Sequence, residues 1–294
     1  ENDFHKFDDF AINNWLERIY LERLQEKQKV ITELLEKSGN NWEETLFKLL
    51  AKNFGLNING NAFLSMAQSI PFPVIRKNRD SAFSLEALFF GQSGILEEKL
   101  EEPYYQELQR EYQFLKRKFN LDNKYVERPK FFRLRPDNFP NIRLSQLASL
   151  YHKVPHLFSE LIKPLDVKDI YRILEVGTSE FWKTHYSFKK PHSSKSKLVT
   201  KPLMDLLIIN TIVPFKFTFQ QWTGTGPTEE LLNIMVKISA EKNSLVNQYN
   251  KIRPGTAGNA MQSQALLHLK KEYCDKNRCL ECNLGAGLLK GNRE

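Results

Sequence analysis

The fold class is decided by one stretch at residues 8–39, DDFAINNWLERIYLERLQEKQKVITELLEKSG. Its apolar residues follow the three- and four-residue spacing of an α-helix rather than the alternation of a strand: Phe10, Trp15, Ile19, Leu24, Ile31 and Leu35. Asp8 and Asp9 can cap the start, and Gly39 can adopt the left-handed conformation that ends a helix. The stretch predicts one long helix reaching about Ser38.

The same spacing recurs along most of the chain. Further helices are predicted at 42–54, from Asn59 or Asn61 to Ile70, and at 85–90, 102–120, 143–153, 156–162, 167–174, 179–185, 227–239, 244–252, 259–273 and 280–289. β-like composition occurs only at 130–134 and 206–219. We therefore predict an all-α protein, either an irregular multi-helix bundle or a solenoid-like helical stack of about ten or more helices.

One segment, residues 123–142, interrupts the helical pattern and carries Pro129, Pro136 and Pro140. It predicts a long Pro-rich crossover between an N-terminal helical half at 1–122 and a C-terminal helical half at 143–294, and the two halves can form one continuous domain. A second irregular segment, KKPHSSKSK at 189–197, has the composition of a mobile basic loop.

Composition excludes several classes of protein. Hydrophobic residues make up 41% of the 294 residues, which is too much for a disordered chain, and three cysteines cannot form a disulfide scaffold. The longest apolar run, 202–219, is broken by Asp205, Asn210, Pro214 and Lys216, so we expect a buried helix kinked at Pro214 and no membrane segment. The absence of a visible targeting segment favours the cytoplasm.

Two basic segments are candidates for nucleic-acid binding, since Lys and Arg outnumber Asp and Glu by 43 to 35. In FFRLRPDNFPNIRL at 131–144, an extended backbone would place Arg133 and Arg135 on one side, with Arg143 following at the next helix start. Lys189 and Lys190 belong to residues 183–201, which contain six lysines and no acidic residue. The alternatives are an ordered linker tied down by its arginines and a solvated loop.

All three cysteines, Cys274, Cys279 and Cys282, lie within nine residues. Thiolates at this spacing can bind zinc or an iron–sulfur cluster, with a fourth ligand from outside this chain. His268 could supply that ligand only if its helix bends back. The alternative is that three small side chains pack where two helices meet.

Several phrases resemble an uncharacterised bacterial family, domain of unknown function 2851. They are LLAKNFG at 49–55, FLSMA at 63–67, EALFFGQ at 86–92, FRLRP at 132–136, FPNIRLSQL at 139–147, INT at 209–211 and the closing Cys segment. The resemblance implies a longer protein whose upstream part, missing here, is similar to restriction-endonuclease-like cores. No catalytic residue of that part can be carried over onto this chain.

These observations predict a protein with no complete catalytic motif of its own. The first hypothesis is a non-catalytic structural or interaction module that packs on an upstream nuclease-like domain or forms a homo-oligomer. The second is a nucleic-acid-binding module that uses basic patches at 128–143 and 183–201.

Overall fold

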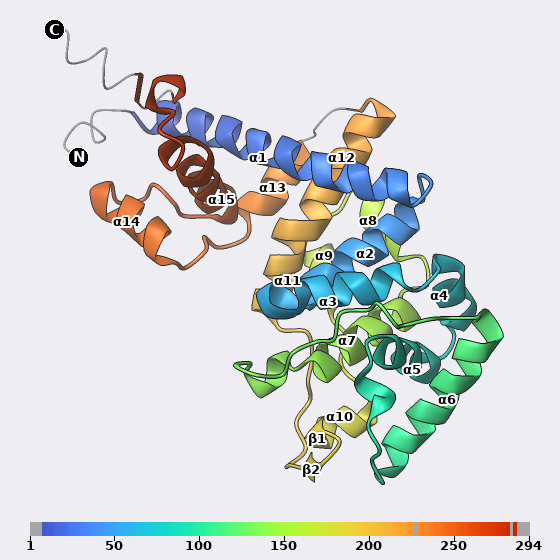
Figure 1. The fold of residues 1–294 in the computed structure, drawn as a ribbon. Helices are drawn as coiled ribbons and strands as arrows, with labels where there is room; N and C mark the ends of the chain where they lie inside the picture. The colour runs from blue at the N-terminus through green and yellow to red at the C-terminus, as the bar shows by residue number, and fades with distance from the viewer. Residues whose placement is uncertain (1–7, 226–228, 283–284, 287–294) are drawn as a thin grey trace, which may run out of the picture. The chain divides into compact units, whose positions relative to one another are not determined.

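The computed structural model describes residues 8–225, 229–282 and 285–286 (Figure 1). The chain divides into two compact units. We call Leu34–Ile212 the central unit, and Glu1–Glu33 with Val213–Glu294 the terminal unit. This division does not coincide with the predicted boundaries at residues 122 and 142, because the first helix is grouped with the last helices of the chain and the Pro-rich crossover lies inside the central unit.

The all-α prediction is confirmed. The central unit contains α2 (Trp42–Phe54), α3 (Leu56–Gln68), α4 (Phe72–Asn78), α5 (Ala82–Gln92), α6 (Pro103–Phe119), α7 (Pro140–Lys153), α8 (Leu157–Ile162), α9 (Val167–Leu174), α10 (Glu180–Thr184) and α11 (Lys201–Leu207). The terminal unit contains most of α1 (Asp9–Lys37), together with α12 (Val213–Thr223), α13 (Glu229–Val236), α14 (Ser244–Ile252) and α15 (Ala260–Leu269). Short 3-10 turns lie at Ile95–Glu97, Pro136–Asn138 and Cys279–Glu281.

A close turn joins α2 to α3. Asn41 caps α2, because its side chain accepts a hydrogen bond from the Glu44 amide at 3.1 Å. A Cβ atom on Gly55 would lie 2.4 Å from the Asn59 carbonyl oxygen, so only glycine fits between the two helices. The third helix therefore begins at Leu56, and its predicted start at Asn59 or Asn61 is wrong.

Helix α5 forms the core of the central unit, and every residue from Leu85 to Gln92 is buried. It contacts α3, α4, α6 and α7. The ring of Tyr112 in α6 lies directly against Gly91, where a Cβ would come within 2.0 Å of the ring. Gly94, with φ of +77°, then turns the chain out of the helix. The predominance of apolar and small residues in α5 is thus explained by its contacts with four other helices.

The apolar run at 201–223 is helical, with a π-helical turn at Ile208–Ile212 between α11 and α12. The π turn ends just before Pro214, whose ring would clash with the carbonyl four residues earlier in a regular helix. The predicted distortion at Pro214 is therefore a π turn. The segment is long and apolar enough to cross a membrane by composition, yet 72% of its most apolar window is buried within the protein, as in core helices of other proteins.

Neither segment predicted to have β-like composition is a strand. Residues 206–219 are helical, and residues 130–134 contain a turn in which Arg133 has a left-handed φ of 62°. Instead, a two-stranded antiparallel hairpin pairs β1 (His185–Ser187) with β2 (Lys190–Pro191). It occupies part of the segment expected to be a mobile loop, and the Tyr186 carbonyl in β1 accepts a hydrogen bond from Asn141, 45 residues earlier in the sequence.

In the terminal unit, α1 carries the contacts that hold the last third of the chain. Asp9 forms an ion pair with Arg253 at 2.7 Å, and Glu22 accepts a hydrogen bond from the Tyr273 hydroxyl at 2.6 Å. Trp15, Ile19 and Leu24 are buried, as the helical spacing predicts. Phe10, in contrast, is 78% exposed because it lies in the first turn of the helix.

Candidate nucleic-acid interface

The positive charge of the protein is concentrated in the central unit. This unit holds 27 Lys and Arg against 20 Asp and Glu, so it carries seven of the eight excess positive charges. Within it, residues 128–143 and 183–201 together hold eleven Lys and Arg and one acidic residue, Asp137. These two segments are therefore the place where a polyanion would be attracted most strongly.

The structure packs these two basic segments against each other. The Asn141 side chain donates a hydrogen bond to the Tyr186 carbonyl at 2.9 Å, and the Gln146 side chain donates one to the Lys197 carbonyl at 3.0 Å. Asp137 accepts hydrogen bonds from the Tyr186 hydroxyl at 2.8 Å and from Lys195 at 3.0 Å. We call the combined surface of residues 128–143 and 183–201 the crossover–hairpin surface.

The crossover is held on the helices by its backbone. Asn59 in α3 donates to the Lys130 carbonyl at 2.8 Å and accepts from the Lys130 amide at 2.7 Å. The Ser65 hydroxyl accepts from the Glu127 amide at 3.1 Å. Arg128 pairs with Glu97 and donates to the Gly94 carbonyl at 3.3 Å. The crossover is consequently an ordered loop, as predicted, which starts at the end of α6 and leads to α7 (Figure 1).

Two of the predicted phosphate-binding residues, Arg133 and Arg135, are exposed. The expectation of a continuous extended backbone is wrong, because residues 132–133 form a turn with Arg133 in the left-handed region. The turn presents the Phe132 ring, which is 77% exposed, and places the Arg133 guanidinium 5.2 Å from the ring centroid. An exposed ring beside a guanidinium is an arrangement that stacks on bases and contacts phosphates.

Acidic side chains neutralise only part of the surface. Ion pairs join Lys183 to Glu180, Lys189 to Glu98 at 3.5 Å, Lys195 to Asp137 and Lys201 to Asp205. Among the described residues, four exposed cations of the surface have no carboxylate oxygen within 4.0 Å: Lys130, Arg133, Arg135 and Lys190. These four can be neutralised by an external polyanion without breaking an existing ion pair.

Arg143, the third predicted phosphate-binding arginine, has a different role. Its side chain is buried, and its two Nη atoms donate to Gln146 Oε1 at 2.8 Å and to Asn138 Oδ1 at 2.5 Å. Burial lowers the pKa of this guanidinium to about 10, with the Asp137 charge opposing that shift. Arg143 therefore orders the start of α7 and the residues before it, as the linker alternative expects.

Lys197 is a second buried cation under the surface. Its Nζ donates to the carbonyls of Trp182 and His185, the latter at 3.1 Å, and lies 2.9 Å from His192 Nε2. Burial lowers its pKa. Partial burial also opposes ionisation of Asp137, but hydrogen bonds from Tyr186 and Lys195 outweigh it and keep the pKa of Asp137 below its usual value. The hairpin is thus tied to the crossover by charge as well as by hydrogen bonds.

Sequence reasoning missed the polar residues that assemble this surface. Asn59, Asn141 and Gln146 are buried amides in α3 and α7, and each bonds to the backbone of a distant segment. A buried amide in a helix is a signal that another segment packs there, because the amide needs hydrogen-bond partners. The sequence does not show which loop supplies them.

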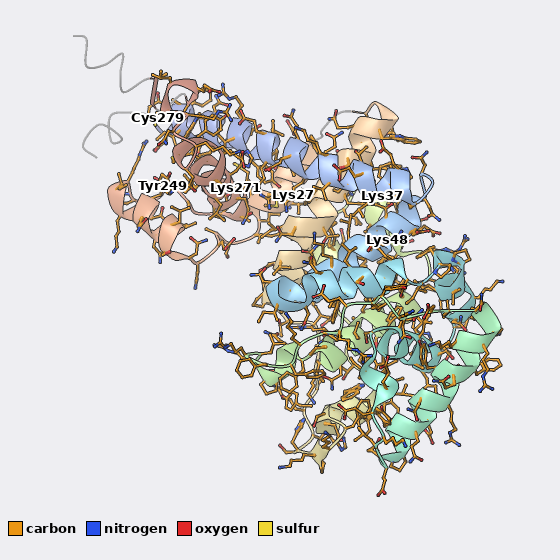
Figure 2. The ribbon with its side chains drawn as sticks, viewed as in Figure 1. Lys27, Lys37, Lys48, Tyr249, Lys271 and Cys279 are labelled. Atoms are coloured by element: carbon orange, nitrogen blue, oxygen red, sulfur yellow. The ribbon has the colours of Figure 1, made fainter. Side chains whose placement is uncertain are left out.

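The three cysteines follow α15 in the terminal unit. Cys274 ends a π-helical turn at Lys270–Cys274 and is exposed, Cys279 is exposed, and Cys282 is buried. Burial and a hydrogen bond with Cys274 raise the pKa of Tyr249, which lies in α14 (Tyr249 and Cys279 are labelled in Figure 2). His268 faces Glu26 instead, at 3.5 Å. Among residues 8–225, 229–282 and 285–286, no group of three His, Cys, Asp or Glu is placed to hold a metal, and the metal site stays a prediction.

Comparison with known families matches residues 1–244 to the family described as "Protein of unknown function (DUF2851)". The chain belongs to this family. The match confirms the resemblance carried by the phrases between residues 49 and 211, and the closing Cys segment lies outside the matched residues. The match does not confirm that an N-terminal part is missing. No curated protein and no solved structure shows significant similarity to this DUF2851 protein.

Proposed function

We propose that this DUF2851 protein is a nucleic-acid-binding module that uses the crossover–hairpin surface and itself catalyses no reaction. One observation supports this most strongly: two segments distant in the sequence, with eleven Lys and Arg and one acidic residue between them, pack into a single surface. Charge gathered in this way from separate segments attracts the phosphate backbone, which supplies most of the affinity in nucleic-acid binding.

Single strands fit this surface better than duplexes. Phe132 on this surface and Tyr125, three residues before the surface begins, are 77% and 86% exposed, and both rings stand beside cations, Arg133 and Lys124. Bases of a single strand can stack on such rings, whereas bases of a duplex are already stacked on each other. The surface exposes no regular helix to enter a major groove, because its part of α7 is buried, the crossover is irregular and the hairpin has only two short strands.

Fluorescence anisotropy tests the proposal with a labelled single strand of about 20 nucleotides and the matching duplex. If the four unpaired exposed cations contact phosphates, the logarithm of the affinity should fall with the logarithm of salt concentration with a slope of about −3 for a single strand. The duplex should bind more weakly. Absence of binding at low salt, or binding that does not change with salt, would contradict the proposal.

A second candidate function is a protein-interaction module, and exposed apolar side chains of the terminal unit favour it. Phe10, Val236 and Leu280 are 78%, 48% and 77% exposed. Large exposed apolar residues are frequent at protein interfaces. We propose a second copy of the chain or a nuclease-like domain of the same protein as the partner. Sedimentation velocity tests the first partner: a mass that stays monomeric at all concentrations contradicts a homo-oligomer.

A further inference from the structure

A cavity of about 350 Å³ lies in the central unit beside the crossover–hairpin surface. Its walls come from the turn after α5, the crossover, the first turn of α7 and the hairpin. Its volume falls within the range of small-molecule sites, near the lower end. The cavity is therefore large enough for one small ligand and too small for a folded partner.

Two aromatic rings line the cavity, Phe131 from the crossover and Phe188 from the hairpin turn. Phe131 packs edge-on against Phe139 with centroids 5.5 Å apart, and Phe188 packs in the same way against Tyr105 at 4.9 Å. Each of the two cavity-lining rings is thus held in place by contact with another aromatic ring. Rings that are fixed in this way suit a planar aromatic ligand, since little side-chain freedom is lost on binding.

Charged groups of both signs line the same cavity. Arg128 and Lys189 supply positive charge, and Glu98 lies 3.5 Å from Lys189. α7 also begins at the cavity wall, and its N-cap residue Phe139 makes no side-chain capping hydrogen bond. The first-turn amides and the helix dipole add to the positive potential there. An anionic ligand with a hydroxyl donor for Glu98 matches this set of groups.

Asn141 gives the most specific information about the ligand. Asn141 is 1% exposed and lines the cavity. Its side-chain nitrogen donates a hydrogen bond to the Tyr186 carbonyl. Its Oδ1 atom has no hydrogen-bond partner among the described residues. A buried acceptor without a partner is costly, so the site calls for a ligand with an N–H or O–H donor.

We propose that this cavity binds a nucleotide, with its base between Phe131 and Phe188, a base N–H donated to Asn141 Oδ1, and its phosphate beside Lys189 and Arg128. A ribose hydroxyl can donate to Glu98. The inference rests on the proposed function insofar as the nucleotide belongs to a bound strand, and it stands independently if the nucleotide is free. No covalent step is involved.

Isothermal titration calorimetry of the full chain with AMP, GMP, CMP and UMP tests the free nucleotide. Adjacent lysines provide the matched variants, because Lys189 lines the cavity and Lys190 does not, while both are exposed on the same hairpin. Lys189→Ala should weaken mononucleotide binding severalfold, and Lys190→Ala should leave it unchanged. Equal effects of the two variants on mononucleotide binding would overturn the proposal.

A second variant pair tests stacking at two exposed rings. Phe131 is 40% exposed and Phe114 in α6 is 56% exposed, and only Phe131 lines the cavity. Phe131→Ala should weaken nucleotide binding about 5- to 150-fold, the loss expected for one stacked base, whereas Phe114→Ala should have no effect. The circular dichroism spectra of both variants should match that of the parent protein.

The same variants identify the source of the nucleotide and separate the two proposals. In the first outcome, mononucleotides do not bind, but a 5′-phosphorylated oligonucleotide does. If Lys189→Ala and Phe131→Ala lower the affinity for this oligonucleotide more than Lys190→Ala and Phe114→Ala do, the cavity holds one nucleotide of a strand. If oligonucleotide binding depends equally on Lys189 and Lys190 and is insensitive to Phe131→Ala, the cavity proposal fails and the surface proposal stands. If only mononucleotides bind, with the predicted variant pattern, the surface proposal fails and the cavity proposal stands.

Discussion

The side-chain amide of Asn59 forms two hydrogen bonds with the backbone of Lys130, 71 residues later in the chain, as donor at 2.8 Å and as acceptor at 2.7 Å. This pair fixes the crossover on α3 just before the exposed residues Phe132 and Arg133. The Asn59 side chain is buried, with 2% of the residue exposed. Its loss would leave the amide and the carbonyl of Lys130 without these hydrogen-bond partners.

We therefore expect Asn59→Ala to lower the free energy of unfolding by about 1–3 kcal/mol and to speed hydrogen exchange at the Lys130 amide. Urea denaturation and hydrogen exchange followed by mass spectrometry measure the two effects. Asn61→Ala is the control, because Asn61 is exposed on the same helix. Unchanged exchange at Lys130 in Asn59→Ala would show that other contacts hold the crossover.

The contribution of the exposed arginines can be read from the salt dependence of binding. Replacing Arg133 by Gly and Arg135 by Ala removes two phosphate contacts, and glycine keeps the left-handed backbone at position 133. The salt slope for a single strand should become less steep by about 1.4, with a similar loss for every sequence. The paired control is Arg110→Ala with Lys168→Ala, two exposed cations on α6 and α9, which should leave the slope unchanged.

The course of α1, α2 and the crossover could be predicted from sequence because their signals are local. Helical spacing, an Asn cap before Trp42 and prolines at 129–140 each act within a few residues. The hairpin at His185–Pro191 and the division of the chain could not be predicted in this way. The division of the chain depends on contacts between distant segments, such as Asp9 with Arg253. The hairpin forms in a segment of loop-like composition, and Asn141 bonds to it from 45 residues away.

The same distinction holds for the candidate site. The sequence shows which segments are basic, since charge is a property of composition. It does not show that Arg143 is buried while Arg133 is exposed, because both are arginines of the same basic segment. The cavity beside them was not predicted at all, since its walls come from four separate parts of the chain.

Serine variants of the cysteines distinguish a metal site from simple packing. If the thiolates bind zinc or an iron–sulfur cluster, Cys274→Ser, Cys279→Ser and Cys282→Ser should each reduce the metal content of the purified protein, measured by elemental analysis. If no metal is bound, only the buried Cys282→Ser should cost stability, roughly 1–3 kcal/mol, and the exposed Cys279→Ser should cost almost none. Purified parent protein without zinc or iron would contradict the metal site.

Glu86 gives the central unit a pH-dependent stability. Its buried carboxyl accepts hydrogen bonds from the Trp182 indole and the Tyr104 hydroxyl. Burial raises the pKa of Glu86 from 4.5 to about 7, although the hydrogen bonds from Trp182, from the serine hydroxyls nearby and from Tyr104 oppose the shift. The folded protein therefore holds this proton more tightly than the unfolded chain does.

Stability from Glu86 is consequently complete below about pH 4.5 and is lost as the pH rises through about 7, by about 3 kcal/mol in total. Glu86→Gln, which carries no charge, should be more stable than the parent protein at about pH 8 and should lose this advantage at about pH 5. Urea denaturation across this pH range measures the difference. Glu107→Gln, at an exposed position on α6, is the control. If the stability difference between Glu86→Gln and the parent is the same at every pH in this range, Glu86 is ionised in the folded protein throughout the range.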